Sequence, residues 1–318
     1  MFLNKKGGFM GELRKDYILD DWVIISSSRG ARPHQFVEEE KVEDKTCFFC
    51  PGSELLTPKE IGRVPAKNGW LLRWFNNKFA AVEACTTQAL QTHNRFYTFA
   101  QNCGTHEIIV ETPDHAKQLW DLSFQDLERV FTVYQNRIFA LETQGMKYVC
   151  VFKNHGVKAG TSLVHAHSQV IAQPLIPKRV QDKLAATRRF LQCPYCDIVQ
   201  SEKNSERRVF ENEQFAAFAP YASRFNYEVW IFPKHHATRL DQLDLCGMAE
   251  AVQHVLARLK TLHCSYNMTL TYAPASTDLH LHVEICPRTA TWAGYEIESG
   301  IIINSVPPED AARFYRNE

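Results

Sequence analysis

The sequence has no surplus of either charge. Lysine plus arginine and aspartate plus glutamate each number 36 among 318 residues, so the formal net charge at pH 7 is zero. A protein that binds nucleic acid through its phosphates carries a basic excess over the binding domain. The composition therefore argues against a nucleic-acid-binding protein, although it leaves room for a local basic cleft.

Long apolar runs are also lacking. No stretch approaches the roughly 18 consecutive apolar residues of a membrane-spanning helix. Residues 1–12 lack the apolar segment and the small-residue cleavage site of a secretory signal. We therefore expect a cytoplasmic protein with no membrane partner, whose 45% apolar content is normal for a globular core.

Cysteines are few outside two short motifs. Of the ten, four form Cys-x-x-Cys pairs, Cys47 with Cys50 and Cys193 with Cys196. In a reducing compartment such pairs are more often metal ligands than disulfides. The other six are scattered and are interpreted as small buried apolar residues. These are Cys85, Cys103, Cys150, Cys246, Cys264 and Cys286.

What the sequence does contain is a repeat. Each half has a Cys-x-x-Cys pair, a strand with Phe-Ala-Ala (expected at 74–82 in the first half), a strand leading to a histidine, an amphipathic helix, a strand and a His-x-His strand. The first helix is predicted over 123–145, from its apolar spacing. Short links between strands favour antiparallel pairing. We predict an α+β fold built by tandem duplication, with helices packed on antiparallel sheets. The two halves are 1–173 and 193–318, joined by a partly helical linker at 174–192.

Each half supplies two thiols and two imidazoles at matching places. Two thiolates and two imidazoles suit tetrahedral zinc, and a site filled by four protein ligands is structural. The predicted sets are Cys47, Cys50, His115 and His165, and Cys193, Cys196, His236 and His280. The spacing also allows His106 for His115, His235 for His236, and His282 for His280. A redox dithiol at the second pair is the alternative, but it explains neither the histidines nor the repeat.

The His-x-His segment of the first half is the candidate active centre. In an extended segment His165, His167 and Gln169 share a face, with the imidazoles roughly 6–7 Å apart. If His165 binds the metal, His167 is left free to attack phosphorus and to form a covalent phosphoramidate. Gln169 and Ser162 are candidates to hold the phosphate oxygens. A plain pair of half-exposed strand histidines is the alternative for the motif taken alone.

Two loops add candidate phosphate ligands. Arg29 and Arg32 follow a predicted strand at 22–25, on a loop rich in serine and glycine, and guanidinium groups bind phosphate by paired hydrogen bonds. Taken alone, two loop arginines are more often simply solvated. Asn154 and Gly156 lie on the loop before the His-x-His segment, where the backbone could approach a phosphate or nucleoside closely.

The segment FKNHGVKAGTSLVHAHSQ, residues 152–169, resembles the active-site segment of the galactose-1-phosphate uridylyltransferase family, in the histidine-triad superfamily. The resemblance extends over CFFCPGSE, FNNKFAAV, TPDH and AGYEIESG, and so over nearly the whole chain. It implies a ping-pong transfer of uridylyl between UDP-glucose and galactose 1-phosphate, as in galactose metabolism, through a covalent intermediate on His167. It implies a homodimer with a site shared between subunits. The expected substrate-binding residues are Arg29, Arg32, Asn77, Asn154, Gly160, Ser168 and, for the hexose hydroxyls, Glu296.

Some residues depart from the common family pattern. Many members have proline between the two histidines and glycine after them, where this chain has Ala166 and Ser168. The His-x-His-Ser-Gln form, the second Cys-x-x-Cys pair and the ending at 294–314 resemble the branch that contains plant ADP-glucose phosphorylase. The alternative activity is therefore an ADP-glucose phosphorylase that uses the same histidine. A histidine-triad hydrolase and a zinc-stabilised binding module without catalysis are the remaining readings.

Overall fold

The computed structural model describes residues 12–27, 47–85 and 91–318. Ten strands form one continuous sheet in the order β10-β11-β12-β14-β13-β8-β9-β7-β4-β3, in which every neighbouring pair is antiparallel. The first half contributes β3 (Glu60–Pro65), β4 (Trp70–Asn76), β7 (Thr105–Val110), β8 (Tyr148–His155) and β9 (His167–Gln173). The second half contributes β10 (Arg208–Glu211), β11 (Phe215–Phe218), β12 (Val229–Pro233), β13 (Tyr266–Thr271) and β14 (His282–Pro287).

Read outward from the central β8–β13 pair, both halves have the same strand order. The first runs β8, β9, β7, β4, β3, and the second runs β13, β14, β12, β11, β10. Each half therefore places its His-x-His strand next to the centre, beside the strand that leads to the histidine of its predicted metal set, His115 or His236. The α+β fold, the duplication and the antiparallel sheet agree with the prediction.

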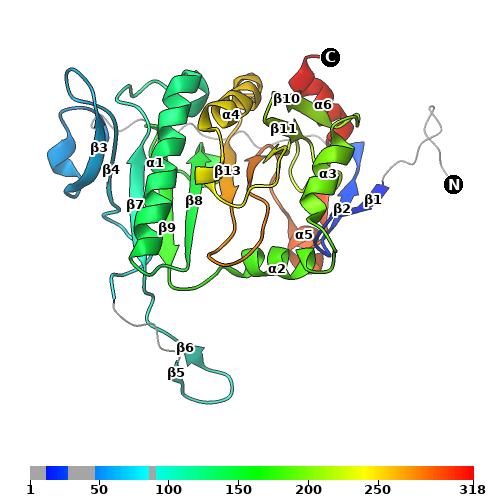
Figure 1. Cartoon of the computed structure of the whole chain (residues 1–318), viewed down its shortest axis with the longest axis horizontal. Helices are drawn as coiled ribbons and strands as arrows, with labels where there is room; N and C mark the ends of the chain where they lie inside the picture. The colour runs from blue at the N-terminus through cyan, green and yellow to red at the C-terminus, as the bar shows by residue number, and fades with distance from the viewer. Residues whose placement is uncertain (1–11, 28–46, 86–90) are drawn as a thin grey trace.

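Two long helices cover one face of this sheet. Helix α1 (Phe124–Thr143) lies over β7, β9 and β8 (Figure 1), and α4 (Leu245–Lys260) packs on α1 and on β10, β11 and β12. The Ser123 hydroxyl accepts the Asp126 backbone N–H, so it is the helix N-cap that the sequence indicated. The apolar faces of α1 and α4 belong to one core that extends through both halves. That core holds the helix-covered face closed and leaves the other face of the sheet for a site.

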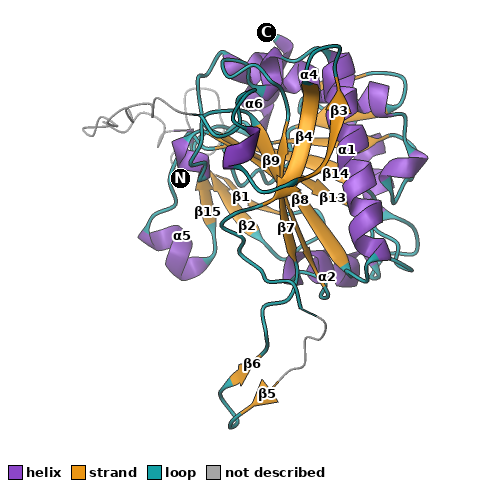
Figure 2. Ribbon diagram, turned by 90° about the vertical axis from the view of Figure 1, so that its left-hand side faces the viewer, coloured by secondary structure: helices purple, strands orange, loops and turns teal. Residues whose placement is uncertain are grey.

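Smaller elements surround the sheet. Helix α2 (Lys178–Thr187) lies in the expected linker, followed by α3 (Pro194–Glu202), and the chain ends with α5 (Gly294–Ser299), β15 (Ile302–Asn304) and α6 (Pro308–Arg316). Short 3-10 turns occupy Glu54–Leu56, Leu119–Asp121, Val157–Ala159 and Leu240–Gln242. Strands β5 (Gln91–Thr92) and β6 (Thr98–Phe99) form an arm that projects from the body (Figure 2). Among the described residues, no helix is both long and apolar enough to cross a membrane.

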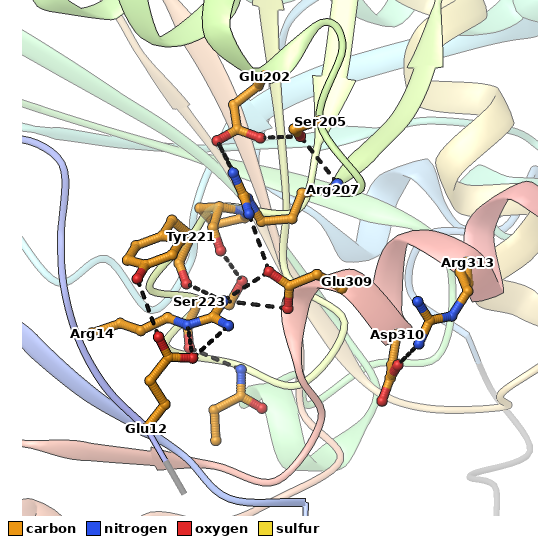
Figure 3. Close-up of polar contacts among 12 residues, drawn as sticks. Glu12, Arg14, Glu202, Ser205, Arg207, Tyr221, Ser223, Glu309, Asp310 and Arg313 are labelled. Atoms are coloured by element: carbon orange, nitrogen blue, oxygen red, sulfur yellow. Dashed lines mark hydrogen bonds and ion pairs between the residues drawn. The ribbon is translucent and has the colours of Figure 1, made fainter. Parts of the chain in front are cut away.

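A small second sheet holds the N-terminal strands on the second half. Strands β1 (Glu12–Lys15) and β2 (Trp22–Ile25) pair antiparallel, and β15 pairs with β2 in parallel. Arg14 and Arg207 both donate to the Glu309 carboxylate, at 3.0 and 3.1 Å, and Arg207 also reaches Glu202 at 2.8 Å (Figure 3). This network ties β1 to α3 and α6, so the first described strand lies on the second half of the fold.

Two predictions about local structure are wrong. The strand expected at 74–82 ends at Asn76, because the Asn77 side chain accepts the Phe79 backbone N–H at 2.9 Å and turns the chain. Phe79 is therefore largely exposed instead of lying in a strand. Cys85 and Cys103, which were interpreted as small buried apolar residues, are joined in a disulfide. The disulfide links the segment after β4 to the start of β7.

Candidate active site

His167 begins β9 and is held in one tautomer. Its Nδ1 donates to the backbone carbonyl of His165 at 2.8 Å, so the proton is on Nδ1 and the lone pair is on Nε2. The side chain is only 6% exposed. Burial lowers the pKa of His167 to about 4, because the charged form loses its hydration. At neutral pH the imidazole is therefore uncharged, as a nucleophile must be.

His167 lies between two cavities. The larger one, of about 410 Å³, also contains Gln169, Ser162 and Asn77, three residues that the sequence selected. Its wall is otherwise mainly aromatic and apolar, formed by Phe48, Phe49, Leu56, Phe75, Phe79, Ile108 and Leu163. The smaller one, of about 120 Å³, contains Asn154 and Gly156 and shares Ser162 and His167 with the larger. This arrangement allows a group to approach the histidine from one side and leave on the other.

The strand that carries His167 rests on a buried ion pair. Lys153 on β8 reaches the Glu111 carboxylate at 2.5 Å and the backbone carbonyl of His167 at 3.2 Å. The hydroxyls of Ser168 and Tyr134 complete the network around Glu111. Lys153 and Glu111 were not selected from the sequence. The only sequence signal for either residue was its charge after a run of apolar residues: Lys153 lies near the end of β8, and Glu111 directly follows β7.

Several predicted substrate residues lie outside both cavities. Ser168 is fully buried and faces α1, because side chains alternate along β9 and those of His167 and Gln169 point to the other face. Gly160 ends a 3-10 turn with a positive φ of 86°. Glu296 lies on α5, where its carboxylate caps the Ala293 backbone N–H, and α5 lies beside β15 (Figure 2). Arg29 and Arg32 lie outside the described residues. A direct role for Ser168 at the substrate is therefore a wrong prediction.

The first predicted metal set comes together. The ligand atoms of Cys47, Cys50, His115 and His165 all lie within 4.8 Å of one another. The Nδ1 of His165 is 3.4 Å from the Cys47 sulfur, and its Nε2 donates to the carbonyl of Thr112 at 2.7 Å. An imidazole whose outer nitrogen donates to a carbonyl is oriented and made more basic for a metal. These four residues fit a tetrahedral zinc ion. His106, the alternative to His115, is not in this group.

The second set has the same construction. Cys193, Cys196, His236 and His280 also converge within 4.8 Å. The Nε2 of His280 faces the carbonyl of Pro233 at 3.2 Å, and that of His236 faces Asp278 at 2.7 Å. His235 and His282, the two alternatives, are not members. The described part of the chain therefore contains two Cys/His groups whose donors suit zinc.

The second-half counterpart of His167 is covered. His282 also donates through Nδ1 to the carbonyl two residues earlier, at 2.9 Å. Its Nε2, however, lies 2.8 Å from the ammonium of Lys183 on α2, and Glu284 occupies the place that Gln169 has in the first half. The ammonium group occupies the position from which a phosphate would approach. This arrangement explains why the first His-x-His segment is the candidate centre and the second is not.

His106 is a titratable residue of the larger cavity that the sequence did not select for function. It lies on β7, is 7% exposed, and its Nε2 is 2.9 Å from the amide oxygen of Gln169. The sequence offered it only as an alternative metal ligand. The contact depends on the pairing of β7 with β9, in which Ile108 lies opposite Gln169. No local pattern contains that register.

Comparison with known proteins agrees with this geometry. A family model described as the N-terminal domain of galactose-1-phosphate uridyl transferase matches residues 9–177, and a model of a domain of unknown function matches 103–314. ADP-glucose phosphorylase of Arabidopsis thaliana is 30% identical, with 96% of this chain and 92% of the relative aligned. Galactose-1-phosphate uridylyltransferase of Thermotoga maritima is also 30% identical, with 96% and 98% aligned.

Solved structures extend the comparison to the fold. The crystal structure of the Arabidopsis ADP-glucose phosphorylase with bound ADP-glucose superposes with a TM-score of 0.82 at 29% identity, covering 97% of this chain and 99% of that chain. A structure of a uridylyltransferase superposes with a TM-score of 0.75 at 27% identity, covering 96% and 97%. The chain therefore belongs to the galactose-1-phosphate uridylyltransferase family, whose members are nucleotidyltransferase enzymes.

Proposed function

We propose that this enzyme is a UDP-glucose–hexose-1-phosphate uridylyltransferase that works through a covalent uridylyl group on His167. The observation that carries the proposal is the unprotonated Nε2 of a neutral, oriented imidazole between two cavities. The lone pair attacks the α-phosphorus of UDP-glucose, and the bond from that phosphorus to the bridging oxygen breaks. Glucose 1-phosphate leaves with the electron pair. A phosphate oxygen of galactose 1-phosphate then attacks the same phosphorus and releases the histidine.

The larger cavity is the better place for the nucleoside. Its aromatic and apolar wall offers faces on which a base can stack, while Gln169 and Asn77 offer amide groups near His167. The smaller cavity, with Asn154 and the backbone of Gly156, then takes the sugar phosphate. Asn154 is already oriented there, because its side-chain oxygen accepts from Asn267 at 2.8 Å.

An ADP-glucose phosphorylase is the second candidate. The Arabidopsis enzyme of that name aligns over 96% of this chain at the same identity as the uridylyltransferase of Thermotoga maritima. The covalent step on His167 would be the same. The nucleotide would be adenylyl, and inorganic phosphate would take the place of galactose 1-phosphate as acceptor.

The intact mass of the protein distinguishes the two candidates. The protein is incubated with UDP-glucose or with ADP-glucose alone and measured without acid, because a phosphoramidate is acid-labile. The variant His167→Gly, which lacks the imidazole, is the negative control. We expect a uridylyl adduct that galactose 1-phosphate discharges. An adenylyl adduct discharged by phosphate would establish the phosphorylase instead. No adduct from either nucleotide sugar, on a folded protein, would contradict the covalent mechanism and leave the binding-module reading.

We also propose that both Cys/His groups hold structural zinc, which would supply folding free energy and fix the ligand loops. Elemental analysis is expected to find two zinc ions per chain. Cys50→Ser and Cys196→Ser should each lower this to one, whereas Cys246→Ser, outside both groups, should keep two. Only Cys50→Ser should also slow adduct formation strongly, because the His165 carbonyl in the first group accepts the Nδ1 proton of His167. Two zinc ions in either ligand variant would contradict the assignment.

The expected homodimer remains a proposal. Glu296 reaches neither cavity of its own chain, so a role for it at the hexose requires a second copy. Sedimentation equilibrium is expected to give twice the 36.6 kDa of one chain. A monomeric mass with full activity would exclude the shared site.

A further inference from the structure

We propose that His106 is a positioning residue that fixes which way the Gln169 amide points, so that its N–H groups face the phosphate. The inference rests on the proposed function, because it concerns how Gln169 meets the transferred phosphoryl group. It assigns a purpose to a buried imidazole in the larger cavity that is neither a metal ligand nor the nucleophile.

The tautomer of His106 follows from its contact with the backbone of Ala81. The backbone N–H of Ala81 donates to Nδ1 at 3.1 Å, so Nδ1 is an acceptor and carries no proton. Burial lowers the pKa of His106, so the ring is neutral and its one proton is on Nε2. That N–H points to the side-chain oxygen of Gln169 at 2.9 Å. The ring can only donate there, so the partner atom has to be the oxygen of the amide and not its nitrogen.

This bond decides what Gln169 presents to the cavity. Glutamine can rotate its amide by half a turn at almost no steric cost, which exchanges two donors for an acceptor. A phosphate oxygen only accepts hydrogen bonds, so a rotated amide would place its carbonyl oxygen against the negative charge. With the oxygen held by His106, the amide nitrogen is the atom left for the substrate. His106 thereby removes an unproductive conformation before the substrate arrives.

The side-chain amide of Asn77 is also held with its N–H groups available to a ligand, but a different group holds it. Its side-chain oxygen accepts the Phe79 backbone N–H, and its amide nitrogen lies 3.1 Å from the Nε2 of His106. Because that Nε2 carries a proton, the two nitrogens do not bond to each other, and the Asn77 N–H groups stay available for a ligand. Two amides on one cavity wall thus both present donors, as an anionic ligand requires.

The second half provides an internal comparison. Trp230 on β12 lies opposite Glu284, as Ile108 on β7 lies opposite Gln169. Two residues before Trp230 and Ile108 stand Glu228, just ahead of β12, and His106 on β7, so Glu228 and Glu284 replace the histidine–glutamine pair. In that half Glu284 forms ion pairs with Arg224 and Lys183, and Lys183 covers His282. The histidine–glutamine pair thus occurs in the half whose imidazole faces a cavity.

A double-mutant cycle on the rate of adduct formation tests the inference. The rate at which UDP-glucose or ADP-glucose labels His167 is measured in a single turnover for the unsubstituted protein, His106→Leu, Gln169→Ala and the double variant. We expect His106→Leu to slow labelling by about 10-fold to 100-fold. In the Gln169→Ala background the same change should have no further effect beyond about two-fold, because the group it orients is gone. His106→Gln, which keeps a donor, should recover most of the rate.

His254→Leu is the matched control, since His254 is a partly buried histidine on α4 outside both cavities, and its rate should be unchanged. If His106→Leu fails to fold, His106→Phe keeps the ring volume and takes its place in the cycle. Equal slowing by the His106 change with and without Gln169 would overturn the inference and leave a purely structural role. Absence of any adduct on the unsubstituted protein would instead overturn the proposed function, and this inference with it.

Discussion

Replacing His167 with asparagine is expected to abolish the covalent adduct and to lower turnover by at least on the order of 10⁴-fold, as removal of a covalent nucleophile does. Asparagine suits the test because its side-chain N–H takes the place of Nδ1–H and can still donate to the His165 carbonyl. The fold around β9 is then kept, while the attacking nitrogen is lost. The loss would lie almost entirely in kcat, since the cavities that bind substrate remain.

The matched control is His282→Asn. It makes the same change at the equivalent strand position of the second half, where the same backbone bond can form. His282 meets the Lys183 ammonium and not a cavity, so adduct formation and kcat should stay within a few-fold of the unsubstituted enzyme. Intact mass and steady-state rates check both variants. A full adduct on His167→Asn, or its loss in His282→Asn alone, would place the nucleophile elsewhere.

Lys153→Met is expected to destabilise the protein by about 3–5 kcal/mol, the cost of leaving a buried charge without its partner. Lys153 and Glu111 are 1% and 0% exposed, so no water can replace the lost ammonium group. The Ser168 and Tyr134 hydroxyls that also contact Glu111 carry no compensating charge. Because Lys153 also holds the His167 carbonyl, adduct formation should slow as well.

Urea unfolding measures the stability change as a shift of the midpoint at constant slope. Lys178→Met is the matched control, because its partner Asp182 and the lysine itself are both exposed, and such pairs add little stability. The double variant Lys153→Met/Glu111→Gln removes both charges and should recover a large part of the loss. A Lys153→Met protein as stable as the control would show that Glu111 is neutral or solvated in the native state.

Much of the fold and of the candidate site could be predicted from the sequence, because the motifs that indicate them are short and each occurs twice. A Cys-x-x-Cys pair and a His-x-His strand are short patterns, and their repetition in one order predicted the duplicated α+β fold and both metal groups. Alternation along an extended segment placed His167 and Gln169 on one face. The helix starting after Ser123 followed from apolar spacing and a capping residue.

The same alternation turns Ser168 away from the face of His167 and Gln169, whereas the prediction that it binds substrate followed from the family resemblance. The packing of α1 on the sheet then shows what Ser168 meets, because its hydroxyl lies beside Tyr134 and Glu111. The turn that exposes Phe79 depends on one side-chain bond from Asn77, which competes with the strand signal of the segment around it.

By itself the sequence determined the family, the duplicated fold, the two metal groups and the identity of the histidine that is left free. Only the tertiary structure decided which of His167 and His282 lines a cavity, because Lys183 covers His282 from a helix about a hundred residues away. It also decided that His106 meets Gln169 and that Lys153 contacts the strand that carries His167. These contacts are set by the register between strands far apart in the chain, which no local pattern encodes.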